Sequence, residues 1–399
     1  METVFQLVRP CKLKFQISSA TDIGGGRENQ DSHFTYYNET ENILIVGVLD
    51  GHGMDYGKLA SESITAMMRE YFEREIESLK SAPYDTIVQA FVLANEHLKT
   101  VIRSDLEKRD FIVKEEDGYL TKRYIRSSVT NPSAWSNISG GTTCTIIAII
   151  NNKMYSANVG DSAAMLFSKQ PIFNHSQNVQ YLGDADAAAV PHERSVVACT
   201  PNSEFLELTA EHSPENLDEY KRVSLHTPPS GVTRVRFIYD SPSTPYKYSC
   251  NPIYETSSNG EITITKRGYY HKNVREEFAS LVTAPHNARF PSSLSMTRSL
   301  GDYFMQSYGV SHLPEVQCVD LEEITASNTE PIHLLVASDG VWDCWKYEDI
   351  AKKMVEIGTS VDEQSSAERL IRENDIIAKQ LFGNNSDNTT AIVVTITSH

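Results

Sequence analysis

The 399-residue sequence lacks any run of apolar residues long enough to cross a bilayer. It also lacks an N-terminal signal segment, in which a charged stretch precedes an apolar one, and it has no glycine after Met1 that could be myristoylated. These absences argue against a membrane partner. We therefore expect a soluble protein in the cytoplasm and/or the nucleus.

Cysteine is sparse, and positive charge is in deficit. The six cysteines are scattered without the spacing of a zinc site or a disulfide framework, so we expect reduced thiols. The chain has 36 Lys and Arg residues against 53 Asp and Glu residues, which gives a formal net charge of −17. Such a charge repels nucleic acid and anionic membranes, so neither is an expected partner. Part of the negative charge is expected to lie in a metal site.

Acidic residues stand at the ends of apolar segments. A run of Ile, Leu and Val typical of a buried strand ends at Asp50, where the following glycine permits a sharp turn. A second apolar run ends at Asp339, again before a glycine, and Asp387 stands just before a third run. Each of these signals alone is also typical of a simple turn. Carboxylates from three distant segments could nevertheless converge on one point, as Mg²⁺ or Mn²⁺ requires.

Eight motifs in a fixed order resemble those of the type 2C metal-dependent Ser/Thr protein phosphatases, the PPM family. They are Gly26–Asp31, Val48–Gly53, Ser139–Thr143, Ala157–Ser162, Leu208–Pro214, Leu294–Asp302, Ala337–Asp343 and Asp387–Thr390. The resemblance runs from Ser18 to Ile396, and an ordered set is far more specific than one acidic or glycine-rich motif. The chain is therefore identified as a member of this family.

The resemblance implies an α+β fold, a four-layer α-β-β-α sandwich with two central antiparallel sheets and a metal cleft at one end. We expect a single catalytic domain, residues 1–399, with surface loops at 109–137 and 168–204. Residues 224–293 stand where the family has a small flap beside the cleft, and here they form a much longer, tyrosine-rich insertion. This insertion is either a tolerated surface segment or a strand-containing lobe that covers the cleft and selects protein substrates.

The resemblance also implies two bound ions, Mg²⁺ or Mn²⁺, and a third in some members. Asp50 would bridge the two ions, and the carbonyl group of Gly51 would bind one of them. Asp339 and Asp387 would hold the other ion. Asp31 would act close to the metals, largely through bound water.

Two further positions receive roles from the same resemblance. Asp161 matches the family position linked to the third, weaker ion, and a turn between two strands is the alternative interpretation. His52 would protonate the leaving Ser or Thr oxygen, which a histidine with a pKa of about 6.5 can do. A structural histidine that caps the turn is the alternative.

The phosphate-binding residue departs from the family pattern. Arg27 would bind the phosphate, but it stands one residue closer to Asp31 than the family's arginine does, and a bidentate fork is geometrically strict. Arg298 is the fallback, although its motif position is more typical of a structural anchor beneath the flap. Gln30 replaces the family's usual Glu and contributes no charge.

The function that the resemblance implies is a metal-dependent protein phosphatase, monomeric, that hydrolyses phosphoserine and phosphothreonine in signalling proteins. Two ions would activate the attacking water. A catalytically weak, phosphoprotein-binding scaffold of the same fold is the alternative, and the retained strand-end carboxylates argue against it. A phosphatase of small phosphorylated metabolites is a third hypothesis that the sequence leaves open.

Overall fold

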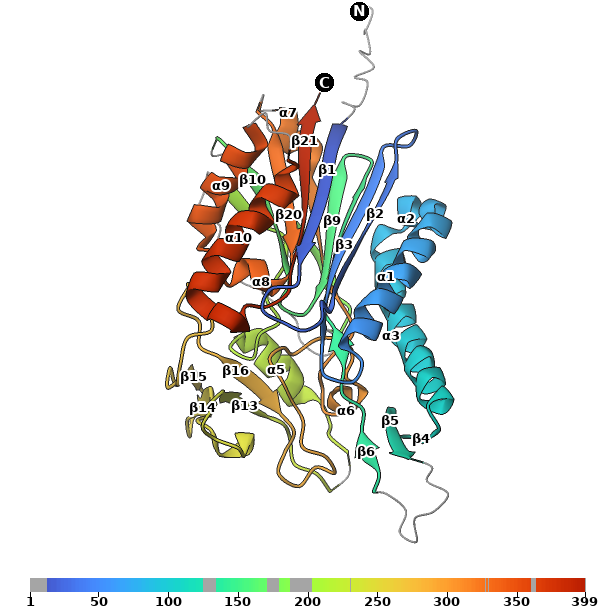
Figure 1. Cartoon of the computed structure of the whole chain (residues 1–399), viewed down its shortest axis with the longest axis vertical. Coiled ribbons are helices and arrows are strands. Elements are labelled where there is room, and N and C mark those ends of the chain that lie inside the picture. Colours follow the sequence, from blue (N-terminus) through green and yellow to red (C-terminus); the bar gives the residue numbers. More distant parts are fainter. Residues whose placement is uncertain are drawn as a thin grey trace, which may run out of the picture.

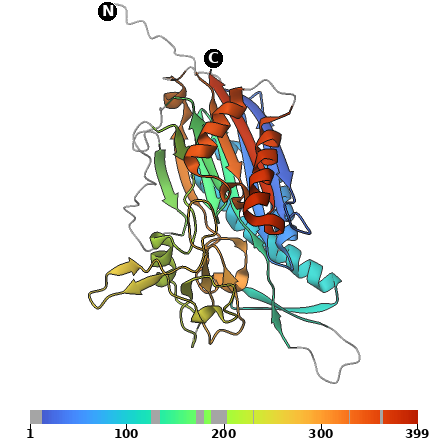
Figure 2. The same ribbon diagram turned by 60° about the vertical axis from the view of Figure 1, so that its left-hand side comes forward.

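Two antiparallel sheets packed face to face, with helices on both outer sides, form the larger part of the molecule (Figures 1 and 2). The computed structural model describes residues 13–124, 134–170, 179–186, 203–229, 231–326, 328, 330–359 and 364–398. The predicted α+β sandwich is confirmed. Among these residues no helix is both long and apolar enough to cross a membrane.

The first sheet has five strands in the order β1-β21-β20-β10-β12, and every neighbouring pair is antiparallel. Its first and last strands along the sequence pair over their whole length, so both ends of the described chain lie at the same end of the sandwich (Figure 1). The strands are β1 (Leu13–Asp22), β10 (Ala163–Ser168), β12 (Phe205–Glu207), β20 (Ile332–Ala337) and β21 (Thr389–Ser398).

The second sheet has eight strands in the order β11-β19-β9-β8-β3-β7-β18, with β2 paired to β3. The strands are β2 (Asp31–Asn38), β3 (Ile43–His52), β7 (Gly141–Thr142), β8 (Cys144–Ile150), β9 (Lys153–Val159), β11 (Val179–Asp184), β18 (Leu300–Gly301) and β19 (Glu315–Asp320). Strand β3 lies well inside this sheet, which explains its unbroken apolar run.

The two faces of β3 belong to different cores. One face packs between the sheets, and the other packs against the helices α1 and α3. The residues facing the first sheet are Leu44, Val46 and Val48, and those facing the helices are Ile43, Ile45 and Leu49. A strand that is buried on both faces is rigid, so the carboxylate at its end is held in a defined place.

Helices cover both outer faces of the sandwich. Helices α1 and α3 contact the second sheet, while α9 and α10 contact the first (Figure 1). The helices are α1 (Gly57–Arg74), α2 (Ile76–Ser81), α3 (Pro83–Lys108), α5 (Leu217–Leu225), α6 (Tyr303–Gln306), α7 (Leu321–Ala326), α8 (Asp339–Trp342), α9 (Tyr347–Thr359) and α10 (Ser366–Phe382). A capping box between Ser365 and Glu368 fixes the start of α10.

The insertion at 224–293 contains strands and lies at the end of the sandwich opposite the chain ends (Figures 1 and 2). A three-stranded sheet and a two-stranded sheet are built from β13 (Arg236–Tyr239), β14 (Tyr254–Thr256), β15 (Ile262–Ile264), β16 (Ser280–Thr283) and β17 (Ser293–Leu294). The short 3-10 helix η1 (Lys247–Ser249) lies between β13 and β14. Buried side chains such as Phe237, Ile253 and Val282 belong to the same core cluster as α1 and α3. The insertion is therefore packed onto the core.

The prediction of a surface loop at 109–137 is wrong where the structure describes it. Strands β4 (Phe111–Glu116), β5 (Tyr119–Tyr124) and β6 (Ser136–Asn137) form a three-stranded sheet, while 125–133 lie outside the described residues. Only a few side chains, Tyr119 and Leu120 among them, are buried under this sheet. Because the buried stretch is short and lies among charged residues, the sequence shows no alternation of apolar and polar residues that would predict these strands.

The predicted loop at 168–204 is likewise interrupted. Strand β11 adds to the edge of the second sheet by pairing with β19. Residues 171–178 and 187–202 of this interval lie outside the described part of the chain.

Candidate metal centre

Asp31 and Asp50 meet across two neighbouring strands. They are direct partners in the antiparallel register of β2 and β3. Burial raises the pKa of Asp50, and the charges of both Asp31 and Asp339 raise it further, so the carboxyl group of Asp50 lies near both of theirs. A bridging ligand of two ions would occupy such a position.

Asp339 and Asp387 come from two neighbouring strands of the other sheet. Asp339 is the first residue of α8 and is separated from β20 by Ser338, and Asp387 is separated from β21 by Asn388. Because β20 and β21 pair side by side, these strand ends lie together. Gly340 makes the approach close: a Cβ atom there would lie 2.1 Å from the carbonyl oxygen of Asn388, so only glycine fits.

Close neighbours, rather than an unusual backbone conformation, require a glycine at position 51. A Cβ atom at this position would lie 2.4 Å from the carbonyl oxygen of Gly57, so glycine lets the start of α1 approach β3. The N–H group of Gly51 donates to the carbonyl oxygen of Gln30 at 3.1 Å. The ligand role of its own carbonyl group stays a prediction.

The electrostatics of the four carboxyl groups favour a bound cation. Burial, reinforced by the neighbouring carboxylates, raises the pKa of Asp50 and of Asp339 well above the ordinary value. Burial also raises the pKa of Asp31 to about 6, and it raises the pKa of Asp387. These groups resist ionisation because like charges are crowded away from water.

Unsatisfied oxygen atoms point to the same conclusion. The Oδ1 atoms of Asp31 and Asp339 are buried and have no hydrogen-bond partner among the described residues. Buried polar atoms are rarely left in this state. An all-oxygen donor set of this kind suits Mg²⁺ or Mn²⁺, so the residues fit a site for two such ions.

Two neighbours that we did not single out from the sequence orient this centre. The hydroxyl group of Ser338 donates to Oδ2 of Asp31 at 2.8 Å. Asn388 Oδ1 accepts from the N–H group of Gln30 at 2.7 Å. The side chain of Gln30 donates to the carbonyl oxygen of Gly53 at 3.2 Å, so it braces the turn. Ser338 and Asn388 both lie inside motifs quoted above, and this was the signal that could have identified them.

His52 is held by a carboxylate. Its Nε2 atom lies 2.6 Å from Oδ2 of Asp302, which also accepts from the hydroxyl group of Ser299 at 2.8 Å. Burial lowers the pKa of His52, but the charges of Asp302 and Asp161 outweigh burial and raise it above the ordinary value. Its Nδ1 atom is buried without a hydrogen-bond partner among the described residues. This geometry is typical of a histidine kept protonated and aimed by a carboxylate.

The two arginines predicted for phosphate binding lie in different environments. Arg27 is exposed on a turn, and it lines neither of the two hollows described around the centre. Its role in phosphate binding therefore stays a prediction. The guanidinium group of Arg298 is fully buried and donates to Asp184, Glu219 and Glu315. Arg298 is therefore a structural anchor, and its fallback role as a phosphate ligand is wrong.

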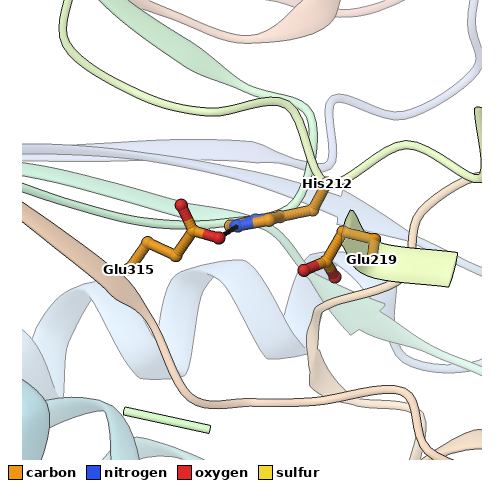
Figure 3. A group of neighbouring side chains, drawn as sticks. All are labelled: His212, Glu219 and Glu315. Carbon is orange, nitrogen blue, oxygen red and sulfur yellow. Dashed lines mark ion pairs between the residues drawn. The ribbon is translucent and has the colours of Figure 1, made fainter. Parts of the chain in front are cut away.

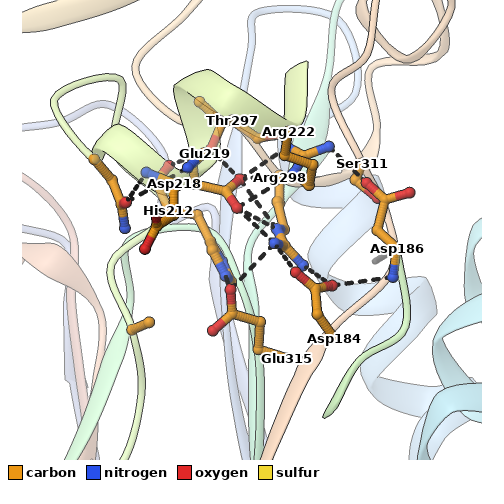
Figure 4. A network of polar contacts seen from close by, with 12 residues as sticks. Asp184, Asp186, His212, Asp218, Glu219, Arg222, Thr297, Arg298, Ser311 and Glu315 are labelled. Atoms are coloured by element: carbon orange, nitrogen blue, oxygen red, sulfur yellow. Dashed lines mark hydrogen bonds and ion pairs between the residues drawn. The ribbon is translucent and has the colours of Figure 1, made fainter. Parts of the chain in front are cut away.

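A second group of ligand-type side chains, His212, Glu219 and Glu315, lies at the first turn of α5 (Figure 3). Two arginines already neutralise it, because Arg222 Nη2 donates to Glu219 Oε2 at 2.8 Å and Arg298 donates to both glutamates (Figure 4). Burial would raise the pKa of Glu219, but the charges of Arg222 and Arg298 hold it well below the ordinary value. The group is therefore an ion-pair network rather than a metal site.

Replacing Arg298 with Met is expected to lower the free energy of unfolding by about 3–5 kcal/mol, because it leaves buried carboxylates without their partner. The depressed pKa of Glu219 stabilises the wild type above pH ~4.5, and this stabilisation is lost as the pH falls further. Urea denaturation at several pH values measures both effects. The exposed pair of Arg267 with Glu255 supplies the control, since Arg267→Met should cost no more than about 1 kcal/mol. Equal losses for the two variants would contradict the anchoring role.

A hollow of about 350 Å³ lies beside the carboxylates and is closed partly by the insertion. Its carboxyl-bearing side chains include Asp161, Asp339 and Asp343 from the sandwich. The two positively charged side chains that line it, Lys272 and Arg275, both come from the insertion. A smaller hollow of about 210 Å³ is lined by His52 and Asp302 among others.

Comparison with known proteins gives matches over most of the chain. A family model described as Protein phosphatase 2C matches residues 73–185 and 276–376. The chain is 20% identical over 334 residues to Protein phosphatase 1L of Bos taurus, covering 83% of this chain and 61% of that protein. It is 21% identical over 398 residues to Putative protein phosphatase 2C 76 of Oryza sativa subsp. japonica, covering 90% and 66%. The chain thus spans less than two thirds of these curated relatives.

A solved structure shares the fold. The chain superposes on the serine-threonine phosphatase 2C from Toxoplasma gondii with a TM-score of 0.57 and 15% identity, covering 97% of this chain and 95% of that one. Asp31, Asp50 and Asp387 lie outside the ranges matched by the family model. The proximity of these carboxylates in the structure is therefore evidence that does not depend on the family match.

Proposed function

Because the chain belongs to the protein phosphatase 2C family, we propose that it is a metal-dependent protein phosphatase that hydrolyses phosphoserine and phosphothreonine. The observation that carries the proposal is the meeting of Asp31, Asp50 and Asp339, two of which present buried oxygen atoms without partners. A structural role would leave no reason to bury such carboxylates together.

Each residue of the centre has a defined task in this proposal. Two divalent cations bound by Asp31, Asp50, Asp339 and Asp387 would supply an activated water and neutralise the phosphoryl oxygens. The rigid strand ends hold the four carboxylates in place before substrate arrives.

His52 would supply the proton that the leaving oxygen needs. Asp302 accepts from Nε2, which leaves the Nδ1 proton for transfer to the leaving Ser or Thr oxygen. The charge of Asp302 raises the pKa of His52, which favours retention of this proton.

The proposal is tested by assaying the purified chain on phosphoserine and phosphothreonine peptides with Mn²⁺ or Mg²⁺ and after chelation. We expect turnover with either ion and none after chelation. Binding of the peptides without turnover would favour the scaffold instead. Turnover of small phosphorylated metabolites alone would favour a different substrate class.

His52→Ala is expected to lower turnover of a phosphoserine peptide by about 10²-fold or more, but to affect an activated aryl phosphate far less. An alkoxide leaving group needs a proton in the transition state, whereas a stable aryl oxide does not. The comparison of kcat/KM on the two substrates measures the difference. His97→Ala, which changes an exposed histidine on α3, is the matched control and should leave both values unchanged. Equal losses on the two substrates would argue against proton donation.

A further inference from the structure

A short piece of the insertion, Lys272–Glu277, is fastened to the wall of the larger hollow, and we call it the docking segment. The N–H group of Val274 donates to the carbonyl oxygen of Asp343 at 3.2 Å. Asn273 Nδ2 donates to Oδ1 of Asp343 at 3.1 Å, and Arg275 Nη1 donates to the carbonyl oxygen of Trp342. Backbone and side-chain bonds together hold this segment against the end of α8.

The docking segment carries an ammonium group into the hollow. Lys272 Nζ lies 3.1 Å from Oε1 of Glu211 and 3.8 Å from Oε2 of Glu277. Burial alone would lower the pKa of this lysine, but the charges of Glu211, Asp343 and Asp161 raise it well above the ordinary value. Lys272 therefore stays charged throughout the range in which an enzyme would work.

Asp161 and Asp343, on the side of the metal centre, line the same hollow as Lys272. Burial raises the pKa of Asp161, and Lys272 is the strongest influence in the opposite direction. Burial raises the pKa of Asp343 to about 6, and here too Lys272 is the strongest influence in the opposite direction. The position that the family resemblance links to a third ion is thus already faced by a fixed positive charge.

A divalent cation at this position would meet unfavourable conditions. It would share the hollow with a charged lysine whose own backbone N–H group donates to Glu277 and whose neighbours Asn273 and Val274 are bound to Asp343. It would also compete with Asn273 and Arg275 for Oδ1 of Asp343. The residues present therefore do not fit a third ion.

We propose that the ammonium group of Lys272 takes the place of a third divalent cation at Asp161 and Asp343, so that the folded chain binds two ions. The inference rests on the two-ion site of the proposed function, but it does not require that the chain hydrolyse a phosphorylated substrate. The insertion would then supply a positive charge to the carboxylates of the cleft in addition to covering it.

The test counts ions rather than activity. The full chain and Lys272→Met are titrated with Mn²⁺ through the millimolar range, and bound ions are counted by electron paramagnetic resonance and by elemental analysis. We expect two ions on the wild type and a third, weaker one on Lys272→Met. The matched control is Lys247→Met, since Lys247 also belongs to the insertion and pairs with Asp240 but does not line the hollow. It should bind two ions.

A third ion on the wild type, or only two on a folded Lys272→Met, would overturn the inference. If Lys272→Met fails to fold, Asp161→Asn decides the question in a chain that keeps the lysine. That variant keeps two ions if Lys272 replaces the third, and it falls from three to two if Asp161 is a ligand. A wild type that binds no ion would remove the two-ion site and this inference together, whereas inactivity with two bound ions would sink only the proposed function.

Discussion

Asp50→Asn is expected to lower turnover of a phosphoserine peptide by at least about 10³-fold, which corresponds to about 4 kcal/mol of transition-state stabilisation. An amide cannot supply the charge with which Asp50, placed between Asp31 and Asp339, would bridge two ions. Asp339→Asn should have an effect of the same order. Steady-state kinetics at saturating Mn²⁺ measures both losses.

The stability of the same variants separates a catalytic loss from a folding defect. The buried carboxylates repel one another in the metal-free chain, so Asp50→Asn should unfold at the same urea concentration as the wild type or a higher one. Asp349→Asn, an exposed change on α9, is the matched control and should retain full activity. A loss of less than tenfold in Asp50→Asn, or a loss explained by unfolding, would contradict the assigned role.

Removing divalent cations is expected to lower the free energy of unfolding at pH 7.5 by about 3 kcal/mol for each ion present at 100 times its Kd. The effect should depend on pH. Asp31 has a pKa of 3.8 when unfolded and about 6 in the folded, metal-free chain. Its raised pKa therefore stabilises the metal-free fold below pH ~4, and this stabilisation is lost as the pH rises through about 6.

The metal-free chain should accordingly be more resistant to urea near pH 5 than at pH 7.5, while the ion-loaded chain should show a smaller change. Bound ions favour the ionised carboxylates, so binding near pH 5 also releases protons. Denaturation curves at both pH values, with K⁺ at matched ionic strength as the control, measure the difference. Curves that are the same with and without Mn²⁺ at pH 7.5 would rule out a metal centre at these residues.

The part of the site that the sequence predicted well lies at strand ends. The carboxylates Asp50, Asp339 and Asp387 follow or precede apolar runs whose length and β-branching identify buried strands from local pattern alone. Sheet pairing then brings these ends together, as the antiparallel neighbours β20 and β21 illustrate. The four-layer sandwich, in contrast, was predicted from the family resemblance and not from local pattern.

The features that could not be predicted from the sequence depend on contacts between residues that are far apart in the chain. The partner of His52 is Asp302, 250 residues away in the sequence, and nothing near either residue marks the pairing. The strands at 111–124 were missed because only a few of their side chains are buried. Arg298 could be assigned as an anchor only once its guanidinium group was found among Asp184, Glu219 and Glu315.

The sequence by itself determined where rigid strands end in carboxylates, because apolar periodicity and a following glycine act over a few residues. The tertiary structure decided which charges face one another. Lys272 meets Glu211 across 61 residues of chain and faces Asp161 from the insertion. Such pairings follow from the packing of whole elements, since an ion pair forms where burial and geometry bring two groups together, whatever their distance along the chain.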